Sequence, residues 1–278
     1  MSSTLCEEVD EGLPHGAEEA HSRAMTGTLP IRTADPEEAA VLMARNGCAL
    51  LTGRGTDADA AQAVAGDVLG ELLALPDASA VREGGEGDRG LVGATEEMGV
   101  HVDGFAYGDR HPDALFLLCA RQSTEGGQSM LVDGEGVLQQ LAHIDPELWH
   151  FLHEVPVDLT EPDMHATCSP IVLRLPSGRC AIRRSPYMAP APDAQDPDRD
   201  AALIARWSDL LGALGSVAPR FTLHPGEVLC VDNYRMLHGR GPFAGERMLW
   251  RIWAWSPRSG GLPEGALHSD SRYAARSA

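Results

Sequence analysis

The chain is 278 residues long, with a formal net charge of -19, a sequence pI near 4.8 and no lysine among its 22 basic residues. An acidic surface argues against binding nucleic acid or an anionic membrane. With 43% hydrophobic residues and a mean hydropathy of -0.18, it reads as a soluble globular protein with no apolar run near the roughly 18 residues of a membrane span. The acidic N-terminus lacks the plan of a signal peptide, so we expect a cytoplasmic protein.

Six cysteines are scattered along the chain without any Cys-x-x-Cys pair, at positions 6, 48, 119, 168, 180 and 230. In a chain without a secretion signal, isolated cysteines in apolar runs behave as small hydrophobic side chains. We therefore predict buried thiols rather than disulfides or a cysteine metal site.

The N-terminal part of the chain predicts an arm, a helix and a strand. Residues 1–27 are polar and acidic, which is typical of a mobile arm. Asp35-Pro-Glu-Glu combines an N-cap residue, a proline in the first turn and acidic residues at the positive end of a helix, and Gly47 predicts its end. Residues 48–52 predict a short buried strand.

A second helix and a long loop are predicted next. Residues 57–75 are rich in alanine and have apolar residues at helical spacing, and Pro76 predicts the end of this helix. Residues 77–99 are rich in Gly, Glu, Asp and Ser, which predicts a long loop. Long loops in compact domains are usually lids or disordered segments, and we favour a lid.

The remaining chain predicts short strands separated by helices. Strands are expected at residues 114–120, 129–132, 170–175, 179–183, 221–223, 227–231 and 248–256. Helices are expected at residues 134–143, 145–154 and 198–214. The turn residues Pro176-Ser-Gly178 predict a hairpin between two of the strands.

This order of elements predicts a mainly β fold with flanking helices and a double-sheet jelly-roll core. A parallel α/β fold would need strands and helices to alternate regularly, and they do not. We expect one domain over residues 28–258 and a C-terminal tail over 259–278, where Gly, Ser, Arg and Ala dominate. The sequence does not indicate an oligomeric state.

The segment 99–107 contains a His-x-Asp pair. In an extended segment the two-residue period puts His101 and Asp103 on the same face. Two histidines and one carboxylate on one side of a metal leave the other side open, as in non-haem iron(II) oxygenases. His238 is our candidate for the second histidine, brought in by a distant element.

Other histidines offer a weaker alternative. A His-x-Asp pair by itself is more often a surface pair, and its significance here depends on His238. His150 and His153 lie three apart on a predicted helix. They lack a third ligand, so we interpret them as part of a solvated helix face.

Three segments, in order, resemble iron(II)/2-oxoglutarate oxygenases of the taurine dioxygenase and clavaminate synthase superfamily. Residues 232–243, DNYRMLHGRGPF, resemble the distal-His segment, His101-Val-Asp-Gly resembles the proximal pair, and residues 125–134 resemble the Gly-Gly-x-Thr segment. The resemblance runs from about residue 30 to 258. It implies a double-stranded β-helix core, the cosubstrates 2-oxoglutarate and O2, and three iron(II) ligands, namely His101, Asp103 and His238.

Such an oxygenase needs a cation for the distal carboxylate of 2-oxoglutarate. Arg247 and Arg251 lie four apart on a predicted strand. The resemblance assigns the carboxylate to Arg247, assisted by Ser129, which replaces the usual Thr. Arg251 would then face the cosubstrate or an acidic group of the substrate. The nine residues from His238 to Arg247 are a short spacing for the family, so Arg251 stays the alternative anchor.

The resemblance implies a small substrate, either amino-acid-derived or a specialised metabolite, that is hydroxylated, desaturated or cyclised. Aromatic candidates for its pocket are Phe105, Tyr187 and Trp253, with strand packing as the alternative for Trp253. Asp103 argues against halogenation, because chloride takes the carboxylate's place in related halogenases. Two other functional classes are alternatives. One is a jelly-roll binding protein that keeps a metal but has no turnover. The other is a zinc hydrolase, for which no glutamate is suitably placed.

Overall fold

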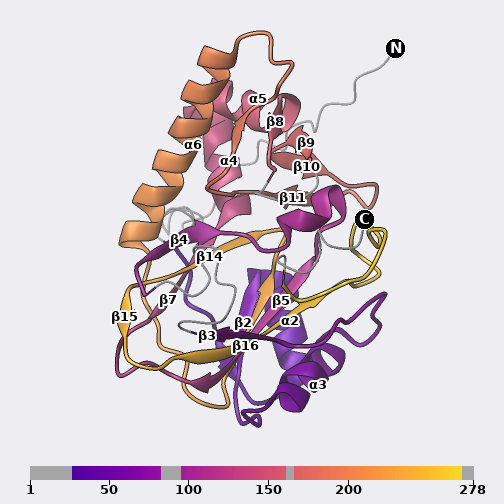
Figure 1. The fold of residues 1–278 in the computed structure, drawn as a ribbon, viewed down its shortest axis with the longest axis vertical. Helices are drawn as coiled ribbons and strands as arrows, with labels where there is room; N and C mark the ends of the chain where they lie inside the picture. The colour runs from indigo at the N-terminus through magenta and orange to yellow at the C-terminus, as the bar shows by residue number, and fades with distance from the viewer. Residues whose placement is uncertain (1–26, 83–94, 161–165, 271–278) are drawn as a thin grey trace, which may run out of the picture.

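Two β-sheets face each other between two groups of helices in the computed structural model (Figure 1). The structure describes residues 27–82, 95–160 and 166–270. This is the mainly β jelly-roll architecture with flanking helices that the sequence predicts. Within the described ranges, no helix combines the length and the apolar character needed to cross a bilayer.

The larger sheet has six strands, which lie in the order β1 (Arg32–Thr33), β2 (Cys48–Leu51), β13 (Val228–Asp232), β5 (Ala114–Arg121), β16 (Met248–Ala254) and β3 (Ser79–Arg82). β1 and β2 pair in parallel, and the other neighbours pair antiparallel. Strands far apart in the sequence are thus adjacent, as expected of a jelly roll.

The smaller sheet facing it has three antiparallel strands, in the order β4 (Met98–His101), β14 (Met236–Arg240) and β7 (Ser129–Asp133). Short strands form three further groups: β10 (Val172–Arg174) with β11 (Cys180–Ile182), β8 (Pro156–Asp158) with β9 (Cys168–Pro170) and β12 (Ala189–Pro190), and β6 (Glu125–Gly126) with β15 (Phe243–Ala244). The β10–β11 pair is the hairpin predicted from its turn residues.

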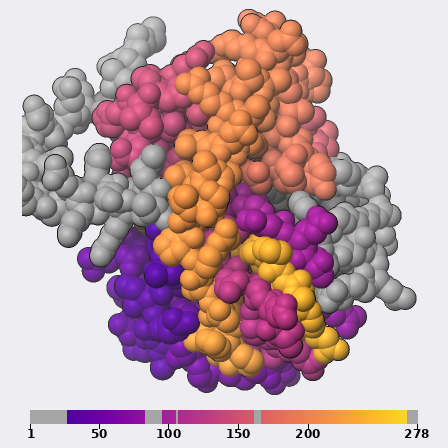
Figure 2. Space-filling model, turned by 90° about the vertical axis from the view of Figure 1, so that its left-hand side faces the viewer, coloured from indigo at the N-terminus to yellow at the C-terminus, as the bar shows by residue number. Residues whose placement is uncertain are grey.

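The helices form two groups. The helices α2 (Pro36–Asn46) and α3 (Ala58–Leu69) lie on the larger sheet. On the side of the smaller sheet lie α4 (Gly134–Ile144), α5 (Pro146–Glu154) and α6 (Pro197–Val217). A 3₁₀ helix, η1 (Phe105–Arg110), follows β4. Figure 2 shows α6, in orange, running along one face of the molecule. An aspartate side chain caps the N-terminus of each described α-helix, as the sequence predicts for α2.

Alternation along the strands directs every second side chain into the space between the two sheets. On β16, Leu249 and Trp253 belong to the apolar cluster between the sheets, whereas Ile252 packs in the cluster beneath α2 and α3. On β4, Val100 packs with α6 in the third cluster. Because successive strand residues point to opposite faces, His101 points from β4 into the inter-sheet space.

Two boundaries predicted from the sequence are wrong. The second helix ends at Leu69 rather than near residue 75, because Gly70 has a positive φ of 71° and donates its N–H to Gly66 O. The predicted loop 77–99 contains β3, which pairs with β16. Hydrogen bonds from the main chain of β16 hold β3 at the edge of the sheet. The residue composition of β3 does not indicate a strand. The lid predicted there lies, over residues 83–94, outside the described residues.

The cysteines are buried only in part. Cys48, Cys119 and Cys230 are buried, which confirms the prediction for these three. Cys168 is exposed on the short strand β9 and Cys180 is partly buried, so the prediction is wrong for Cys168. Cys6 and most of the predicted arm lie outside the described residues.

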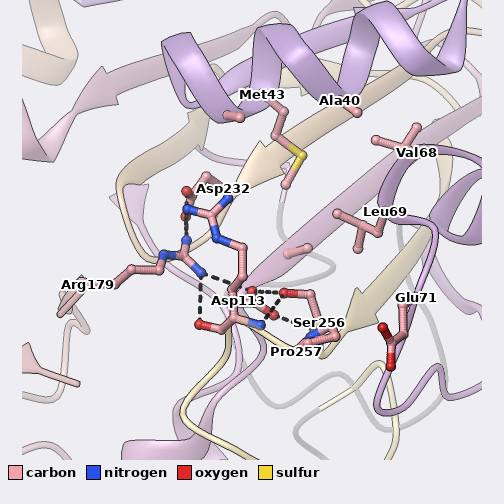
Figure 3. Close-up of a pocket in the computed structure, with 13 residues that line it drawn as sticks. Ala40, Met43, Val68, Leu69, Glu71, Asp113, Arg179, Asp232, Ser256 and Pro257 are labelled. Atoms are coloured by element: carbon pink, nitrogen blue, oxygen red, sulfur yellow. Dashed lines mark hydrogen bonds and ion pairs between the residues drawn. The ribbon is translucent and has the colours of Figure 1, made fainter. Parts of the chain in front are cut away.

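A pocket of about 310 Å³ lies on the helix-covered side of the larger sheet (Figure 3). Its apolar wall includes Met43 and Val68, which belong to the cluster beneath α2 and α3. On its polar wall, Arg179 lies 3.0 Å from a carboxylate oxygen of Asp113 and 2.8 Å from one of Asp232. These charged groups bind one another, and the sheet separates the pocket from the inter-sheet space.

Candidate metal centre

The strands β4 and β14 bring two histidines together. His101 and His238 are opposite each other in the antiparallel register, and their ring centroids are 4.4 Å apart. Their strand neighbours Val100 and Leu237 pack on the helix side of the sheet. The two rings therefore face the inter-sheet space, as alternation along the strands requires.

Asp103 completes the cluster that the sequence predicts. Its Oδ1 lies 3.5 Å from Nε2 of His101 and 3.7 Å from Nε2 of His238. The ligand atoms of the three residues lie within 4.8 Å of one another. In the described part of the chain, this is the only group of three or more such donors. The metal alternative at His150 and His153 is not supported.

The surroundings of the two histidines suit metal binding. Nδ1 of His101 lies 2.9 Å from Gly99 O, and a proton donated there leaves the lone pair of Nε2 free for a metal. Burial, together with the neighbouring His101, lowers the pKa of His238 to about 3. His238 is therefore neutral near pH 7, which is the form that binds metals.

The carboxylate of Asp103 has a different partner at each oxygen. Oδ2 accepts hydrogen bonds from Trp253 Nε1 at 2.9 Å and from Arg251 Nη1 at 3.3 Å, both from β16 of the larger sheet. Burial by itself would raise the pKa of Asp103, but the positive charge of Arg251 holds it well below its usual value. The carboxylate is thus ionised, with Oδ1 directed at the histidines.

The backbone of Asp103 is held by Asn233, which the sequence analysis missed. The Asn233 amide accepts from Asp103 N at 3.1 Å and donates to Asp103 O at 2.9 Å and to Pro112 O at 2.8 Å. Asn233 is fully buried. Its only sequence signal was its place in the segment that resembles the distal-His motif. One amide side chain thus ties the Asp103 turn to the segment leading into β14.

A buried arginine that has no carboxylate partner among the described residues lies on the same chain segment as Arg251. Arg247 is 6% exposed, and its Nε is buried without a hydrogen-bond partner among the described residues. Burial and the nearby Arg240 lower the pKa of Arg247 to about 10, which leaves it charged at neutral pH. Gly127 makes room for it, since a Cβ there would lie 3.3 Å from Arg247 Nε. A buried cation of this kind fits an anionic ligand.

The remaining predicted site residues do not all lie near the triad. Ser129 is buried on β7, two residues after Gly127. Trp253 is fully buried and bonds Asp103, whereas Arg251 contacts Asp103 and the C-terminal segment. Tyr187 is 40% exposed, and no contact within the described ranges joins it to the triad. The side chain of Phe105 lies outside the described residues.

Comparison with known proteins agrees with this geometry. A human gamma-butyrobetaine dioxygenase is 28% identical over 156 residues, which cover 52% of this chain and 40% of that protein. The chain therefore spans less than half the length of this curated relative.

Two solved structures share the fold. An asparagine oxygenase in complex with Fe(II), 3-hydroxyasparagine and succinate matches with a TM-score of 0.58 and 17% identity, over 81% of this chain and 80% of its own. A taurine dioxygenase from Burkholderia xenovorans matches with a TM-score of 0.58 and 18% identity, over 87% of both chains. The model of the family described as "taurine catabolism dioxygenase TauD, TfdA family" matches residues 13–253, so this chain belongs to that family.

Proposed function

We propose that this protein is an iron(II)- and 2-oxoglutarate-dependent oxygenase acting on a small, amino-acid-derived or specialised-metabolite substrate. The observation that carries the proposal is the cluster of the partly buried His101 with the buried Asp103 and His238, whose ligand atoms lie within 4.8 Å of one another. Two histidines and one carboxylate are the donor set of non-haem iron(II) oxygenases, in which the other side of the metal stays open. Family membership and the names of the matched dioxygenases support this assignment.

Each group has a separate task in this proposal. His101, Asp103 and His238 hold iron(II), and when bound, the iron with 2-oxoglutarate and O2 supplies the oxidising power to remove hydrogen from an unactivated C–H bond. Arg247 binds the distal carboxylate of 2-oxoglutarate, assisted by the Ser129 hydroxyl. The apolar side chains between the sheets, such as Leu131 and Leu249, keep water away from the reacting groups.

A substrate screen that measures succinate tests the proposed function. The full-length protein, loaded with Fe(II) and supplied with 2-oxoglutarate and O2, is expected to form succinate slowly by itself and faster with a substrate. Amino acids and their N-substituted derivatives are the first class to test, because the matched asparagine oxygenase holds a hydroxylated amino acid. A protein that binds iron and 2-oxoglutarate yet forms no succinate would support the alternative of a binding protein without turnover.

Replacement of the carboxylate ligand should change the chemistry of the metal site. In Asp103→Ala, we expect hydroxylation to be lost and one coordination position to become open to chloride or azide, because no other described carboxylate joins the cluster. Azide titration of the metal-loaded variant, followed by absorption spectroscopy, measures this opening against the wild type. An unchanged hydroxylation rate in Asp103→Ala would place the carboxylate ligand elsewhere.

A further inference from the structure

The last described residues of the chain pack against β16, the strand that carries Arg251 and Trp253. Ser269 and Asp270 are 1% and 2% exposed, although they lie in the predicted tail and beyond the match to the family model at residues 13–253. Ser269 Oγ accepts from Trp253 N at 3.1 Å. The strand β3 begins at Ser79, opposite Arg251. Ser269 therefore continues the hydrogen bonding of β16 where its edge neighbour stops.

The same segment contacts Arg251 through guanidinium nitrogens other than Nη1, which contacts Asp103. Arg251 Nε donates to Ser269 O at 2.8 Å, and Arg251 Nη2 lies 3.7 Å from Asp270 Oδ2. Asp270 is held in turn by Ser79 Oγ, at 3.2 Å. The guanidinium also lies over the Trp253 ring, 4.7 Å from its centroid. Arg251 thus contacts two carboxylates of this chain, Asp103 and Asp270.

We propose that the C-terminal residues Ser269 and Asp270 position Arg251, and that Arg251 and Trp253 together orient Asp103 as a metal ligand. Arg251 is then a positioning residue of the metal centre rather than a ligand of the substrate or of 2-oxoglutarate. This inference rests on the proposed function only in that the triad holds a divalent metal. It differs from the role that the sequence suggested for Arg251.

The geometry explains why Asp103 needs this support. The terminal torsion of an aspartate is broad, so an unsupported carboxylate can turn either oxygen, or both, toward a metal. Two donors on Oδ2 leave Oδ1 as the oxygen that faces His101 and His238. Partners of this kind fix ligand orientation, and their loss typically weakens metal affinity 10- to 100-fold.

Asp270 has an electrostatic task as well. A divalent ion bound by Asp103 would lie close to the positive charge of Arg251, and in a buried site this repulsion is strong. The negative charge of Asp270, 3.7 Å from Arg251 Nη2, offsets this repulsion. Loss of the Asp270 charge is therefore expected to weaken metal binding both through looser positioning and through the uncompensated charge of Arg251.

The test is a Co(II) titration of the metal-free, full-length protein, without 2-oxoglutarate or substrate. Trp253→Phe removes the indole N–H and keeps an aromatic ring, while Asp270→Asn removes one charge and keeps the shape. We expect each variant to bind Co(II) about 10- to 100-fold more weakly, with an altered visible absorption spectrum. A residue that bound only substrate or cosubstrate would change neither quantity in the absence of both.

Two matched variants control for general loss of stability. Trp255→Phe removes another fully buried indole, one that follows β16 directly and belongs to the cluster between the sheets, and its Nε1 donates to Arg110 O at 2.8 Å. Asp200→Asn removes a carboxylate that is 5% exposed on α6. Both should keep wild-type Co(II) affinity and spectrum, even where urea unfolding shows a loss of stability comparable to that of the test variants.

The outcomes separate the two proposals. If both Trp253→Phe and Asp270→Asn kept the Co(II) affinity and the spectrum of the wild type, the positioning role would be overturned. The proposed function would stay intact. Weaker binding in Trp253→Phe alone would overturn the part assigned to the C-terminal segment. Absence of Co(II) binding by the wild type would overturn the metal triad and the inference together.

Discussion

Replacing either His101 or His238 with alanine is expected to abolish stoichiometric iron binding and all turnover. In the proposed site each histidine supplies one of the three ligands found among the described residues, and the two that remain would form a weak and incomplete site. The measurements are the iron content of the purified protein after anaerobic loading and succinate formation with 2-oxoglutarate. A loss in both variants is the largest effect that the structure predicts.

Histidines outside the triad provide the control. His150→Ala and His153→Ala alter the pair on α5 that the sequence offered as a weaker metal alternative, and His153 Nδ1 is 2.7 Å from Trp149 O within its own helix. Both variants should retain iron and turnover. If His101→Ala or His238→Ala kept near-wild-type activity with stoichiometric iron, the triad assignment would be wrong.

The Arg247→Ala variant is expected to weaken the apparent affinity for 2-oxoglutarate by roughly 30- to 1000-fold. A charge-assisted arginine–carboxylate contact away from bulk water contributes about 2–4 kcal/mol, including the penalty for stranding its partner, and about 1.4 kcal/mol corresponds to a tenfold change. Arg247 is suited to this task because it is buried and has no carboxylate partner among the described residues.

Arg251→Ala is the matched comparison. Both arginines are 6% exposed, but Arg251 already contacts Asp103 and Asp270. At a metal concentration that saturates each variant, Arg251→Ala should lose less 2-oxoglutarate affinity than Arg247→Ala. Arg247→Lys should fall between Arg247→Ala and the wild type, because lysine keeps the charge but loses the two-pronged contact. A larger loss for Arg251→Ala would transfer the anchor to that residue.

Much of the fold could be predicted because its signals are local. The start and end of α2 follow from Asp35, whose side chain accepts from Glu37 N, and from Gly47, whose φ of 79° suits glycine. The strands β5 and β13 are apolar runs buried on both faces. β3 could not be predicted, because its few apolar residues form a strand only beside β16, a partner more than 160 positions later.

The candidate site divides in the same way. The sequence by itself determined His101 and Asp103 as a pair, because alternation in an extended segment is a local rule, and it identified His238 by the resemblance of its segment. Only the tertiary structure decided the partners of Asp103. Trp253 and Arg251 reach Asp103 because the two sheets face each other, and Ser269 and Asp270 contact Arg251 because their segment packs beside β16. Contacts between distant segments depend on the packing of the whole domain, and no local pattern encodes them.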